Sequence, residues 1–218
     1  MFQNSLRKYI LISIFCTSFF TAIGQEKEEN SRKLKKIGFL FNSAKQNNLL
    51  FSDRDYDYKT TILKGQLFYH LSSYKSWEFN LIVQPQFQIS KHQLLNKFFI
   101  PTNSSPDFEE LREKFLPKKT ISIYALELGL QFKRKLSELF YAEFTLGLGA
   151  GYIDIETERM AQGFTFIENI SLGLSYRLKE SEIYIGSNVG HVSNLDFQQP
   201  NHGYNIFGFE IGYRIYIK

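Results

Sequence analysis

A histidine and a serine stand two residues apart near the end of the chain, in the stretch HVSNLDFQQPNHGYN from His191 to Asn205. Serine becomes reactive at neutral pH when a neighbouring base accepts its hydroxyl proton, and imidazole fills that role most often. Side chains at positions i and i+2 of a β-strand share one face, with backbones about 6.6 Å apart. A rotated imidazole can span that separation, so His191 and Ser193 could act as base and nucleophile. The alternative is an interfacial histidine in an ordinary hairpin.

Alternation of apolar and polar residues predicts the strands that must position this pair. From Trp77 to Ile89 every odd position is apolar, whereas the even positions are polar except for Ile82. This period of two is typical of β-strands with one apolar face. The same pattern recurs in eight segments, at approximately 36–44, 60–72, 76–90, 120–134, 138–154, 164–178, 182–194 and 203–217.

The length of the segments and of their connections indicates which face meets water. A soluble barrel or sandwich would bury the apolar face, but these strands exceed both the ~5–6 residues of a typical strand and, in many cases, the ~9–11 residues that cross a bilayer. Short turns follow the second, fourth and sixth segments, and longer loops follow the others, the longest being roughly 91–119. This asymmetry is typical of outer-membrane barrels. We therefore predict an all-β fold, an eight-stranded antiparallel transmembrane β-barrel of the bacterial outer membrane with periplasmic termini.

The first residues predict an export signal. Arg7 and Lys8 precede an apolar run that is short and interrupted by serine and threonine, which favours a signal peptide over a membrane anchor. We predict cleavage after Gly24, so that residues 1–24 form the signal and residues 25–218 a single barrel domain with a flexible segment at 25–35. The sole cysteine, Cys16, lies in the signal, which leaves the mature chain without thiol chemistry.

The charge pattern limits the kinds of binding partner that the chain is expected to have. The net charge is +4, but no basic stripe is interleaved with aromatic residues, so nucleic-acid binding is not expected. The long loop at 91–119 mixes cations with carboxylates; it is either a solvated, partly helical loop or a segment whose cations contact lipid phosphates. The sequence contains neither a phosphate-binding loop nor acidic residues at calcium-site spacing, so no metal or other cofactor is expected.

Strand parity assigns the reactive pair to the lipid-facing wall. In the segment 182–194, the apolar odd-numbered row that starts at Ile183 continues to His191 and Ser193 at the expected extracellular end. In the last segment, Asn205 shares the outward parity and lies near the same end. The pair would therefore meet a lipid rather than bulk water.

One carboxylate interrupts the outward row of the segment 164–178. This residue, Glu168, falls opposite Ser193 or opposite His191, depending on the register of the hairpin. A charge on the lipid face of a barrel is destabilising, less for Asp and Glu than for Arg and Lys. Glu168 is therefore either a partner for His191 or an interfacial carboxylate near the headgroups.

The spacing of the motif adds a resemblance. His191-Val-Ser193-Asn194, followed by Gln199-Pro200-Asn201, Gly203 and Asn205, resembles the C-terminal signature of the PagL family of outer-membrane lipid A 3-O-deacylases, also described as acyloxyacyl hydrolase-like. The match covers about fifteen residues, and the eight-strand plan covers the mature chain. The resemblance implies a serine esterase that removes an ester-linked acyl chain from lipid A of lipopolysaccharide in the outer leaflet. It implies that Ser193 is the nucleophile and His191 the base, and it makes Asn194 and Asn201 candidates for oxyanion stabilisation.

The chain departs from the family pattern at the acid. The family has a glutamate two residues after the glycine, where this chain has Asn205. Asparagine can hold a histidine tautomer but cannot stabilise its positive charge as a carboxylate does. Either Asn205 suffices or Glu168 supplies the charge, and on strand parity we expect Glu168→Gln to cost more activity than Asn205→Ala. The alternative function is a non-catalytic barrel with a binding, adhesion or structural role, and the sequence leaves open whether the barrel forms a homodimer.

Overall fold

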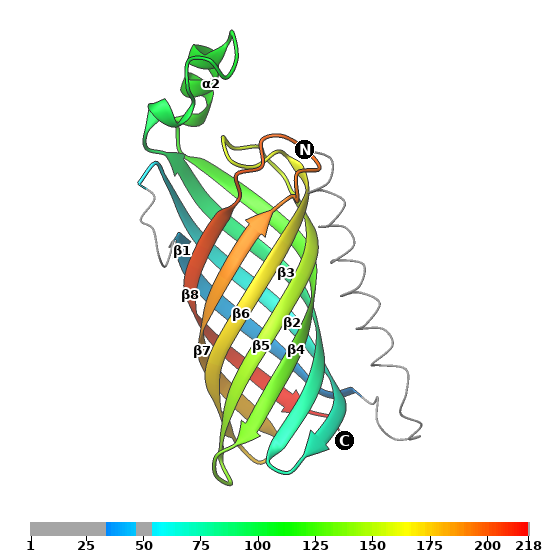
Figure 1. Cartoon of the computed structure of the whole chain (residues 1–218). Helices are drawn as coiled ribbons and strands as arrows, with labels where there is room; N and C mark the ends of the chain where they lie inside the picture. Colours follow the sequence, from blue (N-terminus) through cyan, green and yellow to red (C-terminus); the bar gives the residue numbers. More distant parts are fainter. Residues whose placement is uncertain (1–33, 47–53, 218) are drawn as a thin grey trace. The chain divides into compact units, whose positions relative to one another are not determined.

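The computed structural model describes residues 34–46 and 54–217 of the 218-residue chain. The expected signal peptide at 1–24 and nearly all of the expected flexible segment at 25–35 lie outside the described residues. The strands are β1 (Leu34–Gln46), β2 (Tyr56–Tyr74), β3 (Trp77–Leu94), β4 (Lys119–Lys135), β5 (Phe140–Ile153), β6 (Gly163–Arg177), β7 (Ser181–Ser193) and β8 (Tyr204–Tyr216). Each pairs antiparallel with its neighbours in sequence, and β1 pairs with β8 to close the barrel (Figure 1).

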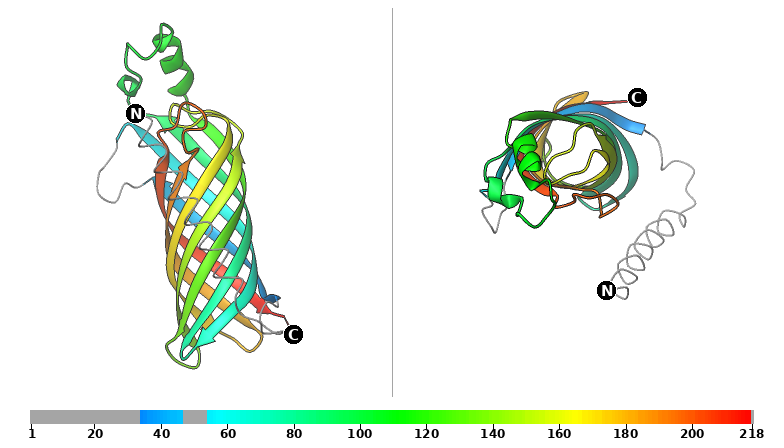
Figure 2. Two further views of the ribbon diagram at one scale, coloured as in Figure 1. Left: turned by 45° about the vertical axis from the view of Figure 1, so that its right-hand side comes forward. Right: turned by 90° about the horizontal axis from the view of Figure 1, so that it is seen from above.

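The eight predicted segments each coincide with one strand. The largest differences are at the long-loop ends of β2 and β3, where the β2–β3 pairing extends to Tyr56 and Leu94. Both of these residues are buried and keep the inward parity of their strands, so pairing continues past the predicted ends. Figure 2 shows the closed ring of strands from above.

The apolar rows point outward. Leu172 on β6 and Phe209 on β8 are 62% and 69% exposed, and the other large outward side chains of the barrel wall are mostly apolar and exposed as well. The alternate positions of the same strands are buried and largely polar. A wall of exposed leucine, isoleucine and phenylalanine around a polar interior is the arrangement expected of a barrel that faces lipid.

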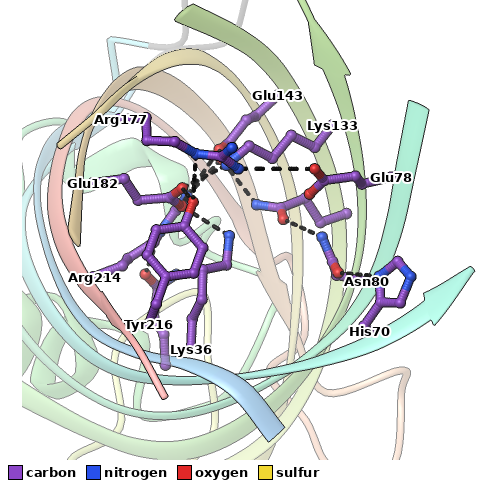
Figure 3. A network of polar contacts seen from close by, with 12 residues as sticks. Lys36, His70, Glu78, Asn80, Lys133, Glu143, Arg177, Glu182, Arg214 and Tyr216 are labelled. Atoms are coloured by element: carbon purple, nitrogen blue, oxygen red, sulfur yellow. Dashed lines mark hydrogen bonds and ion pairs between the residues drawn. The ribbon is translucent and has the colours of Figure 1, made fainter. Parts of the chain in front are cut away.

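The half of the lumen toward the short turns is filled by balanced charges. Among the buried inward side chains of the described strands, four cations face four carboxylates; these are Lys36, Lys64, Lys133 and Arg214, with Glu127, Glu143, Glu182 and Glu210. Figure 3 shows the centre of this network, where Glu182 accepts hydrogen bonds from Lys36, Lys133 and Arg214 at 2.5–3.0 Å. A cavity lined by Lys64, Glu127 and Arg214, among others, measures about 10 Å³, roughly room for one water. The interior at this level is a packed core rather than a channel.

The half of the lumen toward the long loops is apolar, in contrast to the charged half toward the short turns. Its inward positions carry isoleucine, valine and tyrosine, which form an apolar cluster with Met160 from the loop after β5. Within it, the ring of Tyr58 stacks on Tyr204 at 3.9 Å and on His92 at 4.1 Å between centroids. His92 Nε2 lies 2.8 Å from Glu158 Oε2. The mouth of the barrel is therefore closed by packed side chains.

The connections alternate in length as predicted. Short turns at 75–76, 136–139 and 178–180 lie at one end, and the first and last strands start and finish there, since Lys36 pairs with Tyr216. The long loop at 95–118 contains the short helices η1 (Lys97–Phe99) and α2 (Phe108–Phe115), and Figure 1 shows it beyond the opposite rim. Ile100 and Phe115 of this loop pack together with Leu94, the last residue of β3. In the described part of the chain, no helix has the length and apolarity needed to cross a membrane.

Candidate active site

Three neighbouring strands bring the predicted residues into one row. His191 on β7 is the register partner of Glu168 on β6 and of Asn205 on β8. Of the two registers that the sequence allows for the β6–β7 hairpin, the structure has the tighter one, which places Phe166 rather than Glu168 opposite Ser193. All of these side chains have the outward parity, at the long-loop end of the barrel.

Asn205 holds the imidazole of His191. The Nδ1 atom of His191 lies 2.6 Å from Oδ1 of Asn205. An amide oxygen only accepts hydrogen bonds, so in this contact Nδ1 carries the proton and donates it. The neutral ring then presents Nε2 as an unprotonated nitrogen. This is the tautomer that a general base for a serine hydroxyl requires.

Gly203 sets the position of the other edge of the ring. It has a φ of 61°, and a Cβ atom added to it would lie 2.9 Å from Cε1 of His191 and 2.9 Å from the carbonyl oxygen of Val192. A side chain at this position would be strained by the positive φ and would collide with the imidazole and the Val192 carbonyl, so glycine is favoured here. Because Val192 pairs with Tyr204, Gly203 lies at the level of Ser193. The imidazole is thus held between Asn205 and Gly203, with Nε2 toward the end of the barrel at which Ser193 lies.

Ser193 is the last residue of β7 and is only 7% exposed. Its carbonyl oxygen accepts a hydrogen bond of 3.0 Å from the hydroxyl of Thr165, which fixes the backbone against β6. Its own hydroxyl makes no hydrogen bond to any residue that the structure describes. In free enzymes, the hydrogen bond between nucleophile and base is often long and tightens only when substrate binds.

The two asparagines predicted as oxyanion donors organise the loop after β7. The Asn194 backbone N–H donates to Oδ1 of Asn201 at 2.8 Å, and the amide group of Asn201 donates to Asp196 at 3.0 Å. Asn194 is fully buried, and its side-chain amide donates to the carbonyl of Gln198 at 2.8 Å. Asn194 therefore acts within the loop, whereas the partly exposed Asn201 keeps a second amide hydrogen beyond the one that Asp196 accepts.

Glu168 lies beside His191 without a direct bond to it. Its side chain is exposed, and it makes no hydrogen bond or ion pair within residues 34–46 and 54–217. On the side away from His191, its register partner is Leu148 on β5. Of the two candidates for supporting the imidazole, Asn205 is the one that makes a hydrogen bond to it.

Arg159 braces the loop that carries Asn201 and Gly203. Its Nε atom donates to the carbonyl of Gly203 at 2.5 Å, and Nη2 donates to the carbonyl of His202 at 3.1 Å. The guanidinium also packs over the ring of Tyr56, 4.0 Å from its centroid. The backbone N–H of His202 in turn donates to the carbonyl of Arg159 at 2.8 Å. Sequence reasoning does not find this residue, because a single arginine in a loop carries no periodic or motif signal.

Fold and site together define a class: an outer-membrane β-barrel that carries histidine, serine and asparagine side by side on its lipid-facing wall. A family model described as lipid A 3-O-deacylase (PagL) matches residues 55–214, and the chain belongs to this family. It is accordingly an integral protein of the bacterial outer membrane, with the short turns periplasmic and the long loops extracellular.

Comparison with solved structures agrees with the fold. The crystal structure of the outer-membrane enzyme PagL superposes with a TM-score of 0.51 at 10% identity, covering 84% of this chain and 99% of that chain. Neisserial surface protein A gives a TM-score of 0.44 at 11% identity, covering 84% of this chain and 97% of that chain. Among curated protein sequences, no significant match was found.

Proposed function

We propose that the chain is an esterase that removes an ester-linked acyl chain from lipid A, with Ser193 as nucleophile and His191 as general base. Ser193 Oγ attacks the ester carbonyl while Nε2 of His191 accepts the hydroxyl proton. The ester C–O bond then breaks, His191 returns the proton to the sugar oxygen, and an acyl-enzyme remains. Water, activated by the same imidazole, releases the fatty acid.

The hydrogen bond between His191 Nδ1 and Asn205 Oδ1 is the observation that carries the proposal. It selects the tautomer with an unprotonated Nε2, which is the form that can accept the hydroxyl proton of a serine. A half-buried, lipid-facing histidine without a catalytic task would not require this tautomer. The direct test is mass spectrometry of lipid A after incubation with the purified protein in detergent micelles, with loss of one acyl chain as the expected result.

An aromatic patch beside Ser193 supports an acyl substrate. Phe166, the register partner of Ser193, packs edge-on against Phe164 at 4.7 Å between ring centroids. The ring of Phe197, from the loop after β7, lies 6.1 Å from that of Phe164 and 6.3 Å from that of Phe166. Burying a hydrocarbon chain against such a wall contributes about 25 cal/mol per Å² of apolar surface. Because Phe166 is level with Ser193 and Phe164 is one outward position nearer the long loops, the scissile ester would lie at the membrane-facing edge of the patch.

Asn201 is our candidate for stabilising the oxyanion. Its amide group donates one hydrogen to Asp196 and keeps a second one that could donate to a developing negative charge. Asn194, through its backbone N–H, holds the Asn201 side chain in place. In this assignment Asn194 is a positioning residue and Asn201 a catalytic one.

Substitutions at Asn205 and Glu168 test how His191 is supported. Because Asn205 contacts the imidazole and Glu168 does not, we expect Asn205→Ala to lower kcat by about 10- to 100-fold and Glu168→Gln by less than about threefold. This ranking is the reverse of the one inferred from the sequence. Initial rates on lipid A micelles measure it. A larger loss of kcat in Glu168→Gln than in Asn205→Ala would mean that the Glu168 carboxylate stabilises the charge on His191.

Substitution of Arg159 tests the brace. We expect Arg159→Ala to lower kcat about tenfold with little change in KM, because the loop with Asn201 and Gly203 loses its fixed position, and Arg159→Lys to restore part of the rate. Arg134 is a matched control, because its guanidinium also packs over an aromatic ring, that of Trp77 at 5.5 Å from its centroid, but at the short-turn end of the barrel. Equal losses in Arg159→Ala and Arg134→Ala would mean a general effect on folding.

A further inference from the structure

Three lysines stand directly opposite one another on the outer wall. Lys59 on β2 is the register partner of Lys45 on β1 and of Lys91 on β3. All three side chains are exposed and have the outward parity. They lie near the extracellular ends of their strands. We refer to these three residues as the lysine row.

The lysine row is electrostatically unfavourable by itself. Like charges directly opposite on neighbouring strands destabilise a sheet. Lys59 Nζ lies 3.5 Å from a carboxylate oxygen of the partly exposed Asp57. In the part of the chain that the structure describes, Lys45 and Lys91 have no ion pair. At the two ends of the row, the partners are the uncharged Phe207 on β8 and Thr120 on β4. The protein thus leaves an excess of positive charge here, which an external anion would offset.

The neighbouring residues place the lysine row at the membrane surface. The next outward row toward the periplasm consists of Ser43, Thr61 and Ile89, and the row after it consists of Phe41, Leu63 and Phe87. The wall thus changes from aromatic and aliphatic to mixed, with Ser43 and Thr61 beside Ile89, and then to cationic over four residues of each strand. Phosphate groups of outer-leaflet lipids lie at that boundary, where cations are attracted to anionic headgroups.

The lysine row is continuous with the proposed active site. Lys45 is opposite Phe207, which is two residues from Asn205 on β8. Adjacent strands are about 4.8 Å apart and two residues span about 6.8 Å along a strand, so Lys45 and Lys59 lie about 12 Å and about 16 Å along the wall from His191. A phosphorylated disaccharide whose acyl ester is at Ser193 would extend across these strands, within reach of long lysine side chains.

We propose that Lys45, Lys59 and Lys91 bind a phosphate group of the lipid A headgroup and thereby hold the substrate with its ester at Ser193. This inference rests on the proposed function. It assigns to the wall of β1–β3 a recognition role that is separate from the chemistry on β6–β8. It also makes phosphorylation of the headgroup a determinant of substrate choice.

Kinetics with two substrates test the proposal. Purified Lys45→Gln/Lys91→Gln protein is compared with wild type on lipid A and on the same lipid A after enzymatic removal of its phosphates. We expect KM for phosphorylated lipid A to rise at least about tenfold, from about 1 kcal/mol per lysine near an anionic surface, with kcat within about twofold. On dephosphorylated lipid A, the variant and wild type should be indistinguishable. An equal KM change on both substrates, or none on either, would overturn the proposal.

Two controls separate the possible outcomes. Lys75→Gln/Lys179→Gln removes the same charge from exposed periplasmic turns and should keep the wild-type preference for phosphorylated lipid A. Lys45→Arg/Lys91→Arg retains the charge and should also keep it.

Retention of the two lipids by immobilised Ser193→Ala protein reports binding without turnover. If wild type hydrolyses neither lipid, the proposed function fails, whereas the lysine row is still judged by whether Lys45→Gln/Lys91→Gln weakens retention of phosphorylated lipid A in the Ser193→Ala protein. If those substitutions leave the retention of phosphorylated lipid A unchanged, the proposal that the lysine row binds phosphate is wrong.

Discussion

Cells that express the Ser193→Ala variant should keep fully acylated lipid A, whereas cells that express the wild type should show lipid A that lacks one acyl chain. The substitution removes the only atom assigned to attack the ester, so we expect a loss of at least about 10³-fold in rate. Because Ser193 is buried at the end of β7 and its carbonyl makes the bond to Thr165, the loss of a hydroxyl should not disturb the strand. Mass spectrometry of extracted lipid A reads the result.

Ser187 provides a matched control for this experiment. It also lies on the outward row of β7, but its register partners are Leu172 and Phe209, well below the site. Ser187→Ala should deacylate lipid A like the wild type, and both variants should retain the heat-modifiable migration of a folded barrel. Unchanged lipid A with folded wild-type protein would instead favour a non-catalytic barrel with a binding, adhesion or structural role.

Replacing Glu182 with glutamine should produce the largest loss of stability. This carboxylate is fully buried and accepts hydrogen bonds from Lys36, Lys133 and Arg214, and a further one of 2.7 Å from the hydroxyl of Tyr216. Neutralising it leaves three buried cations around the one remaining carboxylate of this cluster, Glu143. Breaking a buried ion pair by removing one partner costs about 3–5 kcal/mol. The free energy of unfolding, measured by urea titration in lipid vesicles, should fall by that amount.

Two further variants serve as controls for the unfolding free energy of Glu182→Gln. Glu109→Gln changes an exposed carboxylate in the first turn of α2 and should leave the unfolding free energy within about 0.5 kcal/mol of wild type. Glu182→Gln/Lys133→Met removes one cation together with the carboxylate and should recover part of the loss. If Glu182→Gln were no less stable than Glu109→Gln, charge balance would not be what stabilises the lumen.

Much of the fold follows from a single physical rule. Successive residues of a strand point to opposite faces, so in a barrel that faces lipid the sequence of each strand alternates between outward apolar residues and inward residues. Turns interrupt this alternation where the chain reverses direction. The polarity of the upper lumen could not be read in this way. There the inward positions are apolar, as at Ile62 and Val192, because they pack against each other and against Met160 from a loop, which is a tertiary contact.

In the candidate site too, some features follow from the sequence pattern and others depend on tertiary contacts. Parity and motif spacing are enough to bring His191, Ser193 and Asn205 to one face. The choice between Glu168 and Asn205 depends on the geometry of side chains across two hairpins, which spacing alone does not determine. The brace by Arg159 depends on two loops that meet above the barrel, where neither loop has a periodic pattern.

The seam between β1 and β8 gives this arrangement a consequence for assembly. The contact between His191 and Asn205 lies within the β7–β8 hairpin and can form as soon as those strands pair, whereas the lysine row lies on β1–β3, across the seam. The His191–Asn205 contact and the lysine row become neighbours only when β1 pairs with β8. A chain in which β7 and β8 are paired but the barrel is still open would therefore hold the His191–Asn205 contact without the lysine row beside it, and closure of the barrel would complete the binding surface.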